Sequence, residues 1–353
     1  NTRARARRPA DMIVRGRSVL DKRDFAANLA FFRAGARLSR RIVTAVYWSN
    51  YGAQNLRYWL RLYDGAGNII AQWEQPVEHA GAGITIDSAD IRKRFGLPAF
   101  MGQLFIHVIG ARGHDVVKYA LDVWGKNGDP SLSVTHDANA WPSVRYATLP
   151  APEADETLTV WVQNSHATTI PAGAITFNPM GVDDHRGVNR AIGPFETLAV
   201  NVGALFPELA WPSQLEMRSG RHLVRPRYEI EQRGRTRIAH LNVERDNIRP
   251  DPAIRNFAPS LGRGFLLPFP ILDPAKFESF VQPNPMSEAL ETLPVRLDIF
   301  DEAGQPVAPH FLGKLPPHHP TTTAHPDLTH SPGPSDLHCH FRAARDADRP
   351  LSS

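Results

Sequence analysis

One hairpin constrains the fold of this chain most, because its turn, its strand register and its alternation can be predicted together from residues 218–245. Arg233 and Gly234 form the predicted two-residue turn, since glycine at the second central position accepts a positive φ at little cost. A turn of this length determines which residues face each other across the strands, and it places Arg227 opposite His240. The stretch is therefore predicted to be an antiparallel β-hairpin.

The two faces of this hairpin differ in chemistry. Opposed residues in an antiparallel pair share a face, and residues along a strand alternate between faces. One face is predicted to be polar and carries Arg225, Arg227, Glu229, His240 and Asn242, with Arg225 opposite Asn242. The other face is mainly apolar, with Val224, Pro226, Tyr228, Ala239, Leu241 and Val243. Ile238, opposite Glu229, is the apolar exception on the polar face. A slip of one residue would mix the two sets, so their near-complete separation supports the register.

Strand and turn signals of the same kind recur along the chain and predict a mainly β protein. Asp64-Gly65-Ala66-Gly67 supplies turn chemistry between two apolar strands. Another hairpin is predicted from residues 104–109 and 115–124, around a glycine-containing turn. Helices are expected only as short connections, such as a turn or two over residues 89–95 capped by Ser88.

An internal similarity predicts that the strands form repeated modules. Residues 293–308 align with residues 56–71 without a gap, and both contain a turn of the pattern Asp-x-Ala-Gly. Between them, residues 158–243 repeat the order of strand, turn and short-helix signals seen in the first part of the chain. Sets of strands at a spacing of roughly one hundred residues are typical of tandem antiparallel β-sandwich modules, immunoglobulin- or fibronectin-like at most in architecture.

These patterns divide the chain into six segments. They are a basic N-terminal segment without assigned structure (1–37), a first β-sandwich module (38–126), a proline-rich connection (127–156), a second module (157–250), the start of an incomplete third module (251–313) and a disordered or non-native tail (314–353). The tail prediction depends on seven prolines in the last 39 residues, without alternation that could complete a sheet. Because the chain begins at Asn1 with no apolar leader core, we expect a fragment or a processed chain.

Charge and composition limit the function classes. The net charge of +4 is carried almost entirely by arginine, with six lysines among 40 basic residues. We interpret this bias as that of a GC-rich, bacterial genome and expect no nucleic-acid partner, because binding would need the charge clustered on one face. The sequence contains no apolar run of about 18 residues, the length that a membrane-spanning helix needs. The single Cys339 excludes an intrachain disulfide and leaves the cellular location undetermined.

Several short clusters carry residue types that bind metals or act in catalysis. They are His338-Cys339-His340, Asp183-Asp184-His185, His136-Asp137 and His114-Asp115. None has the spacing of a recognised zinc finger or catalytic triad, and no G-x-S-x-G, G-x-G-x-x-G, P-loop or H-E-x-x-H motif occurs. We therefore predict no metal site, no cofactor and no catalytic residue, and we interpret the clusters as loop, turn and tail chemistry.

The polar face of the hairpin is the predicted ligand site. Arg225 and Arg227 in one row could clamp a carboxylate, sulfate or phosphate, with His240 and Asn242 as further donors. The same face, which includes Glu229, could instead be a polar seam between two modules held by Arg–Glu pairs. Both interpretations follow from the same pattern of residues.

The sequence thus favours a non-catalytic β-sandwich repeat protein that acts as a structural or ligand-binding module. Its partner would be an anionic ligand, a glycan or another protein module. The alternative is a carbohydrate-active or ester-hydrolysing enzyme, or its accessory glycan-binding domain, whose catalytic part lies elsewhere. A glycan-binding face would expose aromatic rings such as Trp48, Trp59, Trp73 or Trp161, and we expect all four in the core.

Overall fold

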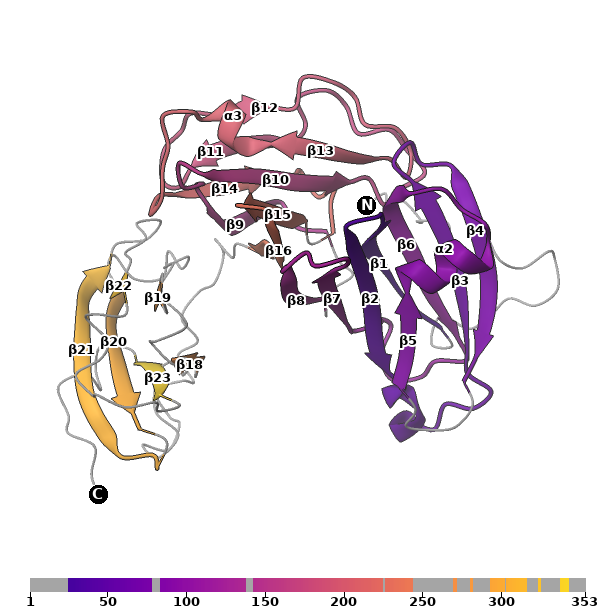
Figure 1. Ribbon diagram of the computed structural model, residues 1–353, viewed down its shortest axis with the longest axis horizontal. Coiled ribbons are helices and arrows are strands. Elements are labelled where there is room, and N and C mark those ends of the chain that lie inside the picture. Colours follow the sequence, from indigo (N-terminus) through magenta and orange to yellow (C-terminus); the bar gives the residue numbers. More distant parts are fainter. Residues whose placement is uncertain are drawn as a thin grey trace, which may run out of the picture. The chain divides into compact units, whose positions relative to one another are not determined.

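The computed structural model describes residues 25–77, 83–137, 142–224, 226–243, 269–271, 280–281, 293–301, 303–315, 323–324 and 337–342. Within these residues the chain is mainly β, and its two α-helices are short (Figure 1). Strands that are neighbours within a sheet run antiparallel. The predicted fold class of antiparallel sheets with short helices in the connections is confirmed.

Two four-stranded sheets form the first sandwich (Figure 1). One sheet has the order β1-β6-β3-β4, with bounds Phe25–Ala34, Phe100–Ile109, Arg57–Asp64 and Ile69–Pro76. The other has the order β5-β2-β7-β8, with bounds Gly83–Asp87, Leu38–Ala45, Tyr119–Gly125 and Leu132–Asp137. The 3-10 helix η1 (Tyr47–Tyr51) and the helix α2 (Ser88–Arg94) lie in connections. Asp87 caps α2 instead of the predicted Ser88, because the Asp87 side chain accepts the Ala89 N–H at 2.7 Å.

Alternation along the strands explains which side chains fill the first core. In β3, Tyr58, Leu60 and Leu62 are buried in one cluster, which also contains Ile42 and Leu121 from the opposite sheet. Full burial of a large apolar side chain stabilises the fold by about 1.5–3 kcal/mol. The core therefore holds the two sheets face to face.

The second sandwich contains a four-stranded and a five-stranded sheet. The first has the order β13-β10-β15-β16, with bounds Thr197–Asn201, Glu156–Gln163, Arg227–Gln232 and Arg235–His240. The second has the order β12-β11-β14-β9-β17, with bounds Arg186–Gly187, Thr176–Pro179, Gln214–Arg218, Arg145–Pro150 and Asn242–Val243. Asn201 caps the short helix α3 (Val202–Leu205), and its side chain accepts the Ala204 N–H at 3.1 Å.

The two sandwiches share one strand order. The sheet β13-β10-β15-β16 corresponds to β5-β2-β7-β8, and β12-β11-β14-β9 corresponds to β4-β3-β6-β1. The short helices α2 and α3 each follow the strand at the edge of the corresponding sheet, β5 or β13. The strands of both sandwiches fall within one compact unit, apart from Pro179 and Gln214, whereas the strands from β18 onward belong to another unit.

Several strands lie where the sequence predicted none. Strand β1 falls within the N-terminal segment 1–37, and β8 and β9 fall within the predicted connection 127–156. Strand β1 is not marked by turn residues, and it becomes ordered because it pairs with β6 along its whole length, from Phe25↔Ile109 to Ala34↔Phe100. Prolines around β8 and β9 indicated a linker, but both strands lie at or near sheet edges, where proline is tolerated.

The hairpin predicted from residues 104–109 and 115–124 is wrong. Strand β6 pairs with β1 and β3, whereas β7 pairs with β2 and β8, so the connection crosses from one sheet to the other. Its glycines mark that crossover and not a tight turn, since a Cβ on Gly110 would lie 2.9 Å from the Gln54 carbonyl oxygen. Consequently the counterpart of the hairpin β15–β16 is β7–β8.

The second unit contains a hairpin with added short strands. Its four-stranded sheet has the order β18-β23-β20-β21, with bounds Phe269–Ile271, Leu337–Arg342, Leu293–Phe300 and Pro306–Leu315. A two-stranded sheet joins β19 (Phe280–Val281) and β22 (Thr323–Ala324). Strands β22 and β23 lie in the segment predicted to lack strands, because short β-forming runs persist between its prolines. The other residues after Leu315 lie outside the described part.

Candidate functional site

The structure confirms the predicted hairpin at its turn. Arg233 and Gly234 have φ values of 48° and 77°, the combination required by a type I′ turn. Arg227 pairs with His240, as the register predicted. At the end of the hairpin far from the turn, the structure differs from the prediction. Asn242 pairs there with Ala147 of β9 in the other sheet and so does not continue the hairpin. Arg225 lies outside the described residues.

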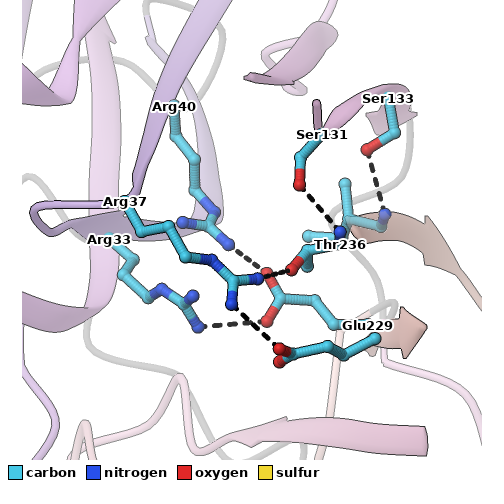
Figure 2. Close-up of polar contacts among 9 residues, drawn as sticks. Arg33, Arg37, Arg40, Ser131, Ser133, Glu229 and Thr236 are labelled. Atoms are coloured by element: carbon cyan, nitrogen blue, oxygen red, sulfur yellow. Dashed lines mark hydrogen bonds and ion pairs between the residues drawn. The ribbon is translucent and has the colours of Figure 1, made fainter. Parts of the chain in front are cut away.

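Glu229 is the centre of the predicted polar face, and it points at the first sandwich. Its carboxylate accepts hydrogen bonds from Arg40 and from Arg33, the latter at 3.1 Å (Figure 2). Glu229 is buried, with 5% of its surface exposed. Both arginines come from the first sandwich, Arg33 from β1 and Arg40 from β2. One carboxylate therefore joins two strands of the neighbouring sandwich.

Arg40 occupies a position in β2 that alternation would assign to an apolar residue, between the inward-facing Leu38 and Ile42. It is fully buried, and its guanidinium lies 5.2 Å from the centre of the Phe31 ring. Burial lowers the pKa of Arg40 to about 10, while the Glu229 carboxylate acts to raise it. At neutral pH the guanidinium is charged, and it depends on Glu229 for compensation.

Arg37 extends the same contact toward solvent. Its guanidinium pairs with Glu231 at 2.9 Å and with Asp129 at 2.8 Å. It also donates to Thr236 Oγ1 at 2.6 Å (Figure 2). The hydrogen bond that Arg37 donates to the Glu231 carboxylate raises the pKa of Arg37. Because Arg37 and Glu231 are each about half exposed, their pair contributes little, about 0–1 kcal/mol.

Arg227, the second predicted ligand residue, is also buried. Its Nη2 donates to Asp137 Oδ2 at 3.0 Å, to the Tyr119 hydroxyl at 3.1 Å and to the His136 carbonyl at 3.3 Å. Burial acts to lower the pKa of Arg227, but Tyr119 and Asp137 act to raise it, and the net shift is upward. An external anion could reach this guanidinium only by displacing Asp137 of the first sandwich.

The edges of the two sandwiches are joined by hydroxyl groups. Ser131 Oγ accepts the Thr236 N–H at 2.8 Å, and Ser133 Oγ accepts the Ile238 N–H at 3.0 Å (Figure 2). These amides belong to β16, the edge strand of its sheet. Edge strands otherwise leave such amides open to pairing with other chains. Side chains of β8 and of the residue before it therefore satisfy two amides on the edge of β16.

Apolar side chains cross the same junction. Phe31 stacks on Trp161 of β10, with 4.7 Å between ring centres, and Arg33 lies over the Trp161 ring at 5.8 Å. Trp161 and Ile238 belong to the second sandwich in sequence but are part of the core cluster of the first. The junction thus combines buried charge, hydroxyl bridges and apolar contact.

His240 and Asn242 are the remaining residues of the predicted site. The His240 ring packs edge-on against His136, with 4.7 Å between centres, and its Nδ1 lies 2.8 Å from Thr135 Oγ1. Asn242 is exposed, and its amide donates to Thr148 Oγ1 at 3.1 Å. The structure therefore brings Arg227, Glu229 and His240 to the junction, whereas Asn242 belongs to another sheet.

Sequence reasoning missed the arginines of the first sandwich. Arg33 and Arg37 lie in the segment left unassigned, and no local pattern connects them with Glu229 or Glu231. Arg40 did carry a signal, because a charged residue stands in an inward-facing row of β2. Such a residue needs a buried partner of opposite charge.

Of the other candidate clusters, His136-Asp137 belongs to this junction, whereas Asp184 and His114 have partners elsewhere. Asp184 pairs with Arg186 at 2.8 Å, and His114 Nε2 lies 3.0 Å from the Tyr51 hydroxyl. Asp137 is taken up by Arg227. Among the described residues, no group of three or more His, Cys, Asp and Glu side chains could hold a metal ion. The side chains of His338-Cys339-His340 lie outside the described part.

The tryptophans considered for glycan binding are buried. Trp48, Trp59, Trp73 and Trp161 have at most 7% of their surface exposed, so their predicted place in the core is confirmed. A stacking platform for a sugar needs an exposed ring face. None of the four offers one.

Comparisons with known proteins identify no family. No family model matches the sequence, and no curated protein matches it. A solved structure titled "Biofilm associated protein - BSP domain" aligns with 94% of this chain at 8% identity and a TM-score of 0.19, and the chain spans 66% of that structure. A score this low carries no argument about fold or function. No helix in the described ranges has the length and apolar character needed to cross a membrane.

Proposed function

We propose that this chain is a non-catalytic structural protein in which two β-sandwiches are held in one orientation by a buried polar junction. The observation that carries the proposal is the pairing of Glu229 with Arg33 and Arg40. The carboxylate and the two guanidinium groups come from different sandwiches, and both Glu229 and Arg40 are buried. A junction of this kind fixes the orientation of the two sandwiches and makes the tandem stiff.

The charges at the junction support this role because they match one another. Four arginines face four carboxylates, namely Arg33, Arg37, Arg40 and Arg227 with Asp129, Asp137, Glu229 and Glu231. A matched set needs no external anion for neutrality. A ligand that displaced a buried partner would leave a charge unpaired, at a cost of about 3–5 kcal/mol.

The geometry of the contacts favours one fixed orientation. Hydrogen bonds are directional, so a rotation of one sandwich would break the bonds of Ser131 and Ser133 together with the ion pairs of Glu229 and Arg227. Domains without such contacts move relative to each other by default. The tandem is therefore suited to act as a stiff spacer or scaffold within a larger assembly.

The experiment measures the distance between spin labels on the two sandwiches in the full chain. Labels at the exposed positions Lys93 and Ala199, in a Cys339→Ser background, report on α2 and β13. The expected result is one narrow distance distribution that broadens in Glu229→Ala. The matched control is Glu231→Ala on the same strand, which removes an exposed carboxylate and should leave the distribution narrow.

A broad distribution without any junction substitution would refute a fixed orientation. So would a distribution that stays equally narrow in Glu229→Ala when circular dichroism shows that both variants are folded. The first outcome would make the sandwiches independent modules, and the second would place the stiffness elsewhere in the contact.

A further inference from the structure

The hairpin turn of β3–β4 has a well-defined geometry. Asp64 Oδ1 accepts the N–H groups of Ala66 and Asn68 at 2.9 and 2.8 Å, which stabilises the turn from within. Gly67 has a φ of 87°, in the region that favours glycine. A β-bulge lies between Leu62 and Tyr63, directly before the turn. The turn therefore presents its backbone in one conformation.

This turn, residues 64–67, is where the loop of residues 193–197 from the second sandwich docks. The Thr197 N–H donates to the Gly65 carbonyl at 3.0 Å. The approach is so close that a Cβ on Gly67 would lie 2.2 Å from the Pro194 carbonyl oxygen. Only a residue without a side chain fits there.

Aromatic and amide contacts strengthen the docking of the 193–197 loop. Tyr63 stacks on Phe195, with 4.5 Å between ring centres and 12° between ring planes. Gln103 Nε2 donates to the carbonyls of Phe195 and Asn164 at 2.7 and 2.9 Å. The turn, the aromatic ring before it and the neighbouring strand form one docking surface.

The hairpin β20–β21 reproduces this turn in the second unit. Asp301 Oδ1 accepts the N–H groups of Ala303 and Gln305 at 3.0 and 2.7 Å, and Gly304 has a φ of 76°. A β-bulge lies between Ile299 and Phe300, the same place relative to the turn, and Phe300 supplies an aromatic ring where the first hairpin has a tyrosine. In both turns the glycine N–H donates to the aspartate carbonyl, at 3.1 Å for Gly67 and 3.0 Å for Gly304.

Within the described residues, the 301–304 turn differs from its counterpart because no loop covers its glycine. Ala303, Gly304 and Gln305 are exposed. In the part of the chain that the structure describes, no heavy atom lies within 4 Å of the position of a Cβ on Gly304. The conformation that binds a loop in the first sandwich is therefore present here with its glycine open to solvent.

We propose that the 301–304 turn docks a further β-sandwich module through a loop of the same kind as residues 193–197. The partner would supply a carbonyl that approaches Gly304, as the Pro194 carbonyl approaches Gly67. A second copy of this chain does not fit the role, because its own 193–197 loop is already bound by its 64–67 turn. The inference rests on the proposed structural role and names the surface that extends the tandem.

The first test asks whether the sequence of the 301–304 turn can accept a 193–197 loop. The substitutions Tyr63→Phe, Gly65→Glu and Asn68→Gln convert the first turn into the sequence Phe-Asp-Glu-Ala-Gly-Gln of residues 300–305. A Cβ on residue 65 would lie 3.2 Å from the flexible end of Met101 and 3.3 Å from the Met101 carbonyl oxygen, so the graft needs a shift of a few tenths of an ångström there. The expected result is a Tm within about 2 °C of the unmodified chain, whereas a fall of about 6 °C or more would overturn the proposal.

The second test examines the 301–304 turn in place. Gly67→Val should release the 193–197 loop within the full chain, because valine fits neither the φ of 87° nor the space beside Pro194. The released loop should bind the 301–304 turn of another copy, which sedimentation velocity detects as a larger species than the unmodified chain forms. Gly67→Val combined with Gly304→Val should abolish that species.

Two results of this second test would overturn the proposal. One is a Gly67→Val chain that sediments like the unmodified chain, and the other is self-association that survives Gly304→Val. If Gly67→Val does not fold, the graft decides the matter alone. Neither variant touches Glu229 or Arg40, so failure here is distinguishable from failure of the fixed junction.

Discussion

Removing the carboxylate of Asp137 should destabilise the tandem strongly, because it would leave Arg227 charged at a buried position. Arg227 has 1% of its surface exposed and Asp137 also has 1%. The loss of one partner of a buried ion pair costs about 3–5 kcal/mol. Since urea m values lie near about 2 kcal/mol per M, the urea midpoint of Asp137→Ala should fall by about 1.5–2.5 M.

Tryptophan fluorescence is a suitable assay, because all seven tryptophans precede residue 244 and so report on the sandwiches alone. The decisive comparison is the double variant Arg227→Met with Asp137→Ala. Replacing a buried ion pair by apolar residues is often neutral or stabilising, so the double variant should recover most of the lost stability. A single variant that loses less than about 1 kcal/mol, or a double variant as unstable as the single one, would refute the argument that an unpaired charge is the cause.

Three further predictions concern other contacts. Gly67→Ala should destabilise the chain more than Gly234→Ala, because both glycines have a positive φ but only Gly67 approaches a carbonyl closely; urea midpoints compare them, and equal losses would contradict the packing argument. Ser133→Ala should cost about 1 kcal/mol and speed up hydrogen exchange at the Ile238 amide, and unchanged exchange would mean that the hydroxyl does not protect that amide. Burial lowers the pKa of His107 to about 4, so the unfolded chain takes up a proton between about pH 6.5 and 4 that the folded chain refuses. The free energy of unfolding should therefore decrease as the pH is lowered through this window, by about 3 kcal/mol at about pH 4. Urea titrations at about pH 6.5 and about pH 4 measure this decrease, and His107→Leu should reduce it.

Local chemistry was sufficient to predict the turn at Arg233-Gly234 and the two turns of the pattern Asp-x-Ala-Gly. Arg233-Gly234 requires positive φ at both positions, and few turns other than a tight hairpin satisfy that. Residues 56–71 and 293–308 carry the same Asp-x-Ala-Gly pattern, and each turn closes through its own aspartate. These features depend on neighbours within about five residues, which a sequence displays directly.

Sheet partners could not be predicted in the same way. Strands β6 and β7 follow each other after a glycine-containing link, which suits either a hairpin or a crossover between sheets. The connection between β6 and β7 is a crossover because β6 pairs on one side with β1 and on the other with β3. That outcome depends on residues far apart in the chain, and alternation carries no information about it.

The sequence predicted the hairpin side of the candidate site but not the residues that it contacts. The polar row of Arg227, Glu229 and His240 was identified with the correct register, and a seam between modules was one of its two interpretations. Its partners were not identified, because Arg33 and Arg40 lie 196 and 189 residues from Glu229. The inward-facing row of β2 indicates that Arg40 needs a buried partner of opposite charge, but no local pattern indicates which carboxylate that partner is.

The sequence alone thus determined turn geometry, strand alternation and the likeness of the first and third hairpins, because these depend on φ preferences and on the two-residue period of a strand. Only the tertiary structure decided that the polar face of β15 meets β1 and β2, since a buried charge is stable only where its counter-charge arrives in the folded chain. Tertiary structure likewise decided that the loop of residues 193–197 covers the 64–67 turn, whereas within the described residues Gly304 of the 301–304 turn, with the same local chemistry, is exposed.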